Sequence, residues 1–172
     1  MRNIFTVLIM GLYTFGLQAQ QVYEHQFLVK VGDKAPNFEV KLNNGSIFKL
    51  SEQRGKIVML QFTASWCSVC RKEMPFIEKD IWSPLKEKDF VLVGMDYKEQ
   101  QDRVEAFAEQ MKITYPLGID STGSAYHLFA QEGSGVTRNV IIDKEGKIIY
   151  LTRLFNTEEF EKMKAVIFNA VK

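Results

Sequence analysis

The chain has 172 residues, of which 46% are hydrophobic, so it is long enough for one globular domain with a full core. Its formal net charge of +1 gives no electrostatic reason to expect nucleic acid as a partner. Its two cysteines, Cys67 and Cys70, are too few for the disulfide framework of a small exported domain.

The N-terminus has the composition of a targeting segment. Arg2 precedes an uncharged, mostly apolar run from Asn3 to Leu17, and Ala19 then provides a small residue for cleavage. The run is short for a membrane span, which needs about 20 apolar residues. We therefore expect residues 1–19 to be a cleaved signal peptide of a periplasmic protein, followed by the domain at 20–172. An uncleaved membrane anchor is the alternative.

The remaining chain alternates between strand-like and helix-like segments. Asn44-Gly45 predicts a hairpin turn between two short strands, and the apolar run at 56–62 predicts a buried central strand. A helix should follow from Cys67 toward Ile81. A strand, an amphipathic helix, a short strand, a short helix, a hairpin and a last helix are then expected at 90–96, 102–111, 115–120, 124–130, 138–153 and 157–171. This order predicts an α/β fold with a mixed sheet, antiparallel at one edge, and helices on both faces.

Cys67 and Cys70 stand where the central strand ends and a helix begins. Free N–H groups at a helix N-terminus stabilise a thiolate, which lowers the pKa of Cys67 and makes it nucleophilic. Cys70, one turn later, should be more buried and should resolve the mixed disulfide. The alternatives are that the pair forms a structural disulfide or supplies two of the ligands of a metal site. A loop this short stabilises little, and tetrahedral zinc needs four ligands, so we expect no metal.

Glu73 shares a helix face with Cys70, three residues earlier. It is therefore the candidate proton acceptor for the resolving thiol. The alternative is an ordinary exposed glutamate paired with Arg71 or Lys72.

The segment FTASWCSVC, followed by RKEMP, resembles the W-C-x-x-C helix of thioredoxin-fold proteins. It is most similar to the exported thioredoxin-like proteins of TlpA and ResA type. That group has a lead-in like VGDKAPNFEV, an acid at the position of Glu73, and an insertion like TYPLGIDSTGSAYHLFA. The resemblance spans residues 31–172 and implies a thioredoxin-like fold with Trp66, Cys67 and Cys70 in the active site.

Two positions depart from that pattern. The family's cis-proline, before the late hairpin, is replaced by Thr137, so we predict a trans Val136–Thr137 bond and an altered substrate loop. The resemblance makes Val136, Thr137 and Arg138 the candidate substrate-binding residues; Arg138 either brings positive charge near the thiolates or is solvated. Gln61 replaces the buried acid of cytosolic thioredoxins and cannot titrate.

Three functions follow. The first is a thiol-disulfide oxidoreductase that acts on exported proteins; the resemblance implies a reductant with a membrane electron donor. It needs no cofactor, and we expect a monomer. The second is a peroxiredoxin-like thiol peroxidase, although Ala64 stands where peroxiredoxins have threonine. The third is a non-catalytic thioredoxin-like binding module, for which the Thr137 loop is the best support.

Overall fold

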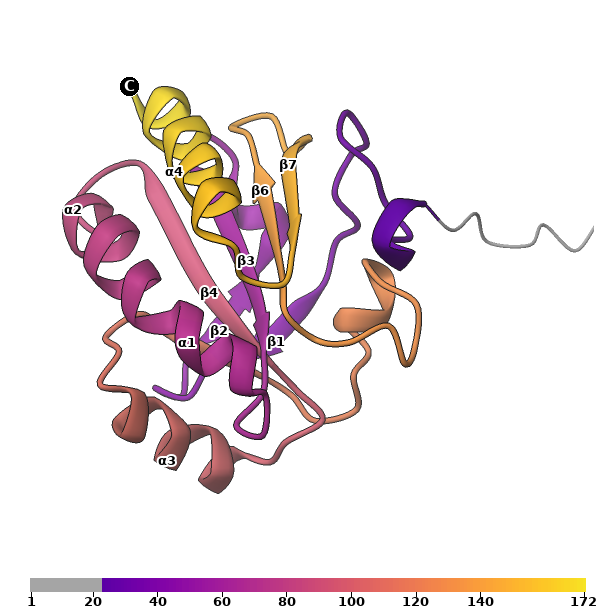
Figure 1. Ribbon diagram of the computed structural model, residues 1–172, viewed down its shortest axis with the longest axis vertical. Helices are drawn as coiled ribbons and strands as arrows, with labels where there is room; N and C mark the ends of the chain where they lie inside the picture. Colours follow the sequence, from indigo (N-terminus) through magenta and orange to yellow (C-terminus); the bar gives the residue numbers. More distant parts are fainter. Residues whose placement is uncertain (1–22) are drawn as a thin grey trace, which may run out of the picture.

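A five-stranded mixed sheet forms the centre of the molecule, with strand order β5-β4-β3-β6-β7 (Figure 1). The computed structural model describes residues 23–172, so the expected signal peptide lies outside the described residues. β3 pairs in parallel with β4, and β4 with β5, whereas β6 and β7 are antiparallel. The strands are β3 (Ile57–Thr63), β4 (Phe90–Tyr97), β5 (Leu117–Asp120), β6 (Arg138–Ile142) and β7 (Ile148–Arg153). The predicted mixed sheet is confirmed.

The predicted N-terminal hairpin consists of β1 (Glu39–Lys41) and β2 (Ile47–Lys49). Gly45 has φ +86°, a conformation that side chains other than glycine rarely adopt, so the Asn-Gly pair fixes this turn. The hairpin is a separate two-stranded sheet that reaches β5 through a bridge between Leu42 and Gly118.

The helices at 68–77, 101–111 and 157–171 lie where the sequence predicts them, whereas the short helix at 83–85 lies beyond the predicted end near Ile81. They are α1 (Ser68–Ile77), α2 (Ser83–Leu85), α3 (Gln101–Met111) and α4 (Thr157–Val171). Pro75 lies inside α1, and the chain widens into a π-helical turn at Glu78–Trp82 before it continues into α2. Proline removes one backbone donor from a helix and often causes such an irregularity. None of the helices within residues 23–172 is both long and apolar enough to cross a membrane.

The two faces of the sheet are covered unequally (Figure 1). Side chains of α1, α3 and α4 pack on one face, and Phe160, Met163 and Ile167 of α4 are buried there. The other face is covered by the hairpin, the lead-in and the short 3-10 helix Tyr126–Leu128. The stripe on α4 is therefore core, and α1 is held firmly enough to position the side chains at its start.

Candidate active site

The two cysteines form a disulfide at the start of α1, directly after the end of β3. Cys67 is the N-cap residue of α1, and its Sγ accepts a hydrogen bond from the backbone N–H of Cys70 at 3.1 Å. Cys67 is 7% exposed and Cys70 is 0% exposed, so the predicted difference in burial is confirmed. In the dithiol state the same backbone N–H and the helix N-terminus stabilise a Cys67 thiolate.

Thr137 brings a hydroxyl group to both sulfurs. Its Oγ1 lies 3.2 Å from the Sγ of Cys67 and 3.2 Å from that of Cys70. The Val136–Thr137 peptide bond is trans, as predicted. The residue that replaces the family's proline therefore faces the disulfide and adds a hydrogen-bonding group there.

Trp66 is 62% exposed beside the disulfide, although it is large and hydrophobic. It lines a cavity of about 330 Å³ together with Tyr97, Tyr126 and Val136. Lys98 and Glu132, which form an ion pair at 2.8 Å, also line this cavity. The structure thus brings Trp66 and Val136, two of the predicted site residues, to one mostly apolar hollow next to Cys67.

Arg138 is fully buried, so the expectation of a solvated arginine is wrong. Its guanidinium group donates to the carbonyl and hydroxyl oxygens of Ser134 and to the carbonyl of Gly135, and it lies 4.5 Å above the ring of Phe27. Burial lowers the pKa of Arg138 below its usual value. The hydrogen bonds from the Arg138 guanidinium group thus hold the loop that precedes Thr137 in place.

Glu73 is 2% exposed, so the alternative of an exposed helix glutamate is also wrong. Its two carboxylate oxygens accept hydrogen bonds from the side-chain amides of Gln61 and Asn139, at 3.3 and 2.7 Å. Burial raises the pKa of Glu73 to about 7, while the two amide donors act in the opposite direction. A carboxyl group with this pKa exchanges a proton near neutral pH.

Two further acids, the half-buried Glu99 and the fully buried Asp96, lie near the loop that leads to Trp66. Glu99 accepts hydrogen bonds from the backbone N–H and the hydroxyl of Ser65, both at 2.6 Å. The pKa of Asp96 is raised to about 9, chiefly by burial and also by the nearby charge of Glu99. Burial acts to raise the pKa of Glu99, but its interactions with Asp96, Ser65 and Arg103 outweigh burial and hold that pKa below its usual value. Asp96 is thus a neutral acid next to an ionised Glu99.

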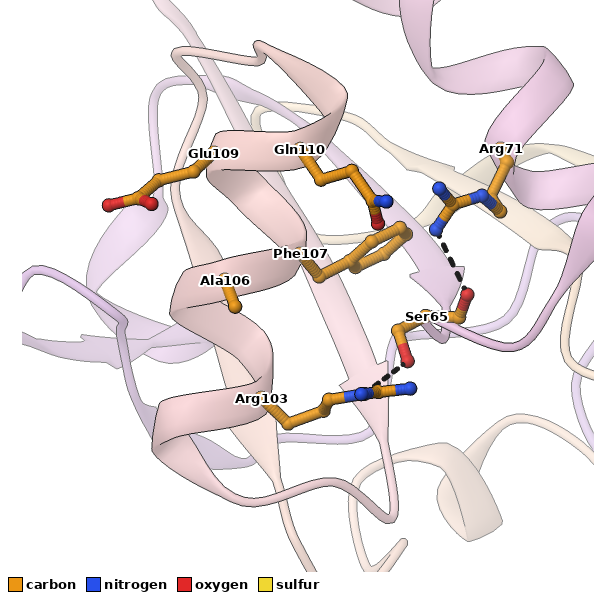
Figure 2. Close-up of a pocket in the computed structure, with 7 residues that line it drawn as sticks. All are labelled: Ser65, Arg71, Arg103, Ala106, Phe107, Glu109 and Gln110. Carbon is orange, nitrogen blue, oxygen red and sulfur yellow. Dashed lines mark hydrogen bonds between the residues drawn. The ribbon is translucent and has the colours of Figure 1, made fainter.

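Figure 2 shows a second cavity, which is lined by Ser65, Arg71 and Arg103 among others. Its volume is about 590 Å³. Arg71 from α1 and Arg103 from α3 both point toward Ser65 and donate to its carbonyl and hydroxyl oxygens, at 3.1 and 2.9 Å. The guanidinium group of Arg71 also lies 5.5 Å from the centre of the Phe107 ring. The loop before Trp66 is therefore fixed from both helices.

Sequence reasoning missed Asp96, Glu99, Tyr115 and Asn139. The signal for Asp96 and Asn139 was a polar residue within a strand that is mostly apolar, and both residues are fully buried. Glu99 and Tyr115 lie in connecting segments, where the sequence gives no comparable signal.

Comparison with known proteins agrees with this geometry. The model of the AhpC/TSA family matches residues 31–151, well over half of the chain. The thiol-disulfide oxidoreductase ResA from Bacillus anthracis is 30% identical over 149 residues, which cover 86% of this chain and 83% of the relative.

Two solved structures show the same fold. A proposed protein disulfide isomerase from Bacteroides thetaiotaomicron is 50% identical, with a TM-score of 0.83 over 85% of this chain and 92% of its own. A proposed thiol:disulfide interchange protein DsbE from Chlorobium tepidum is 27% identical, with a TM-score of 0.74 over 84% of this chain and 99% of its own. With a disulfide at the start of α1, the chain belongs to the AhpC/TSA family and is a thioredoxin-fold thiol-disulfide oxidoreductase.

Proposed function

We propose that this protein reduces disulfide bonds in exported client proteins, with Cys67 as the nucleophile and Cys70 as the resolving thiol. The observation that carries the proposal is the unequal setting of the two sulfurs. Cys67 caps a helix and is partly accessible, whereas Cys70 is fully buried one turn from the buried Glu73. The direction toward reduction is supported by the resemblance to the TlpA and ResA type.

The reaction proceeds in two exchanges. The Cys67 thiolate attacks one sulfur of the client disulfide, forms a mixed disulfide, and releases the other client sulfur as a thiolate. Cys70 then gives its proton to Glu73, and its thiolate attacks the Cys67 sulfur. The second client thiolate leaves, and the Cys67–Cys70 disulfide forms. The client gains two electrons and the protein loses two, so a separate donor must restore the dithiol.

The hollow beside Trp66 and Val136 is suited to the client chain. Val136 precedes β6 and makes no backbone hydrogen bond to the rest of residues 23–172, although it is 4% exposed. An extended client segment is therefore positioned to pair with it by strand addition, while the exposed Trp66 covers the apolar part of that segment. Thr137, which faces both sulfurs, lies next to the bond being exchanged.

The place of action and the electron source are parts of the same proposal. Residues 1–19 act as a cleaved signal peptide, which places the domain in the periplasm, where disulfides persist. A membrane protein then supplies the electrons. N-terminal sequencing of the periplasmic form tests cleavage: a mature chain that begins near Gln20 supports it, and retained Arg2 contradicts it.

Stopped-flow reaction of the reduced protein with a chromogenic aromatic disulfide tests the chemistry. Attack and resolution release the chromophore in two phases. We expect Glu73→Gln to leave the first phase unchanged and to slow the second about tenfold or more, because the internal base is lost. Glu87→Gln, at an exposed position, is the control. An unchanged second phase would show that Glu73 is not the acceptor.

The reduction potential of the Cys67–Cys70 pair tests whether the protein reduces or oxidises its clients. A value near about −270 mV, in the range of thioredoxin, supports a reductant, whereas a value near about −120 mV would make the protein an oxidant.

A further inference from the structure

Two amide side chains, which come from neighbouring strands, contact the carboxylate of Glu73. Gln61 of β3 and Asn139 of β6 are directly opposite each other in the antiparallel ladder, and both are fully buried. Each donates a hydrogen bond to a different carboxylate oxygen of Glu73. The carboxylate of α1 therefore contacts an amide donor at each of its oxygens.

Both amides have a further partner that fixes their orientation. The hydroxyl of Tyr115 donates to the Oε1 of Gln61 at 2.8 Å, so the amide nitrogen of Gln61 is the atom that faces Glu73. The Nδ2 of Asn139 also donates to the hydroxyl oxygen of Thr152 at 2.8 Å, and these two residues are opposite each other between β6 and β7. Five side chains, none more than 4% exposed, thus form one continuous polar network through the core.

This arrangement acts on the proton equilibrium of Glu73. Burial favours the neutral acid, whereas two N–H donors favour the carboxylate. The groups that face Glu73 from the sheet are the neutral side chains of Gln61, Asn139 and Thr152, and Tyr115 stays protonated because burial raises its pKa well above the usual value. From α4, the charge of Glu159 raises the pKa of Glu73 as well. Without the amide donors, nothing among these groups would keep Glu73 ionised at neutral pH.

We propose that Gln61 and Asn139 are positioning residues for the resolution step: they favour the carboxylate form of Glu73 and fix its orientation, and Tyr115 fixes the amide of Gln61. The inference rests on the proposed function, in which Glu73 accepts the proton of Cys70. It gives the non-titrating Gln61 a role in the reaction, whereas cytosolic thioredoxins have a buried acid at that position.

The test uses three variants of the full domain. Asn139→Leu and Gln61→Met each remove one amide donor at similar volume, and Tyr115→Phe removes only the hydroxyl that orients Gln61. Gln53→Met is the matched control, because the amide of Gln53 donates to the backbone carbonyl of Lys49, away from this network. The titration of Glu73 is followed by carboxyl ¹³C NMR, with Glu73→Gln to assign the signal. The two-phase disulfide reaction is followed across pH in parallel.

We expect the Glu73 midpoint to rise by about one pH unit in Asn139→Leu, since a hydrogen bond to the charged form is lost. A smaller rise is expected in Gln61→Met, the smallest in Tyr115→Phe, and none in Gln53→Met. The pH profile of the second kinetic phase should shift upward by the same amounts, while the first phase stays unchanged. If Asn139→Leu does not fold, the titration midpoints of Gln61→Met and Tyr115→Phe test the inference.

If the titration midpoint of Glu73 does not move in the folded variants, the inference is overturned. This holds even if the second kinetic phase slows, because slowing alone fits a merely structural role. A midpoint that rises while the second phase keeps its pH profile supports the amide network and instead removes Glu73 from the proposed reaction. The two failures are therefore distinguishable.

Discussion

The hydroxyl oxygen of Thr137 lies 3.2 Å from the sulfur of Cys67, within reach of a hydrogen bond. In the dithiol protein this hydroxyl can donate to the thiolate, and a hydrogen bond to the charged form lowers a pKa. Thr137→Val keeps the side-chain volume and removes the donor. We expect it to raise the pKa of the Cys67 thiol by about half to one unit, since each unit corresponds to about 1.4 kcal/mol.

The pH dependence of alkylation by iodoacetamide measures this change. At a pH below the thiol pKa, Thr137→Val should react about three- to tenfold more slowly than the parent. Thr122→Val, at an exposed position, should react like the parent. Identical pH–rate curves for Thr137→Val and the parent would show that the hydroxyl does not act on the thiolate.

Glu99 anchors the loop before Trp66 through both of its oxygens, so its charge should matter for the stability of that loop. Glu99→Gln replaces one acceptor by an NH₂ group, which cannot accept from Ser65. We expect a loss of about 1–3 kcal/mol in unfolding free energy, the usual cost of a hydrogen bond to a charged group. Faster hydrogen exchange at the Ser65 amide should accompany it.

Glu109→Gln is the control, because Glu109 is exposed and points away from Ser65 in Figure 2. Equal denaturant midpoints for Glu99→Gln and this control would mean that Arg71 and Arg103 hold the loop without Glu99.

Asp96 makes stability depend on pH in an unusual direction for an acid. Its pKa is about 9 in the folded protein and 3.8 for the unperturbed group, so between these values the folded state binds the extra proton. The unfolding free energy should therefore fall as pH rises, by at most about 1.4 kcal/mol per pH unit from this one group. Glu73 contributes in the same direction, but only up to its folded pKa of about 7.

Urea unfolding of the oxidised protein between pH 7 and 9 isolates Asp96 from Glu73. Asp96→Asn removes the titrating group and keeps a neutral polar side chain of the same size, so it should flatten this slope and stabilise the protein at pH 8. Asp89→Asn, at an exposed position, should retain the slope. A slope that persists in Asp96→Asn would assign the pH dependence to another group.

The peroxidase alternative expects a threonine at the position of Ala64, and this chain has none there. The hydroxyl of the neighbouring Thr63 is buried and donates to the sulfur of Met74 at 3.6 Å. We expect the reduced protein to consume hydrogen peroxide no faster than a small-molecule thiol of similar pKa. Peroxide turnover well above that rate, lost in Cys67→Ser, would restore the peroxidase function.

The parts of the structure set by local sequence could be predicted. Asn44-Gly45 fixed the hairpin, the apolar spacing of 157–171 gave α4, and Cys67 was placed at a helix start because a buried strand ends just before it. Periodicity and turn chemistry act over a few residues, and one sequence is enough to evaluate them.

The surroundings of the polar residues could not be predicted in the same way. The sequence left open whether Arg138 and Glu73 are exposed to water, and the structure shows both buried. Gln61 and Asn139 face each other only after β3 and β6 pair, a contact between residues 78 positions apart. Such partners depend on tertiary packing, so the sequence pointed to the two sulfurs and to Glu73 but not to the hydrogen bonds that surround Glu73.

The complete burial of Cys70 offers a way to identify the natural clients. A Cys70→Ser chain still presents the Cys67 sulfur, which is 7% exposed, but it has no second sulfur to release what Cys67 has captured. Such a chain becomes bait: each client it attacks stays covalently attached and can be isolated without a reductant and identified by mass spectrometry.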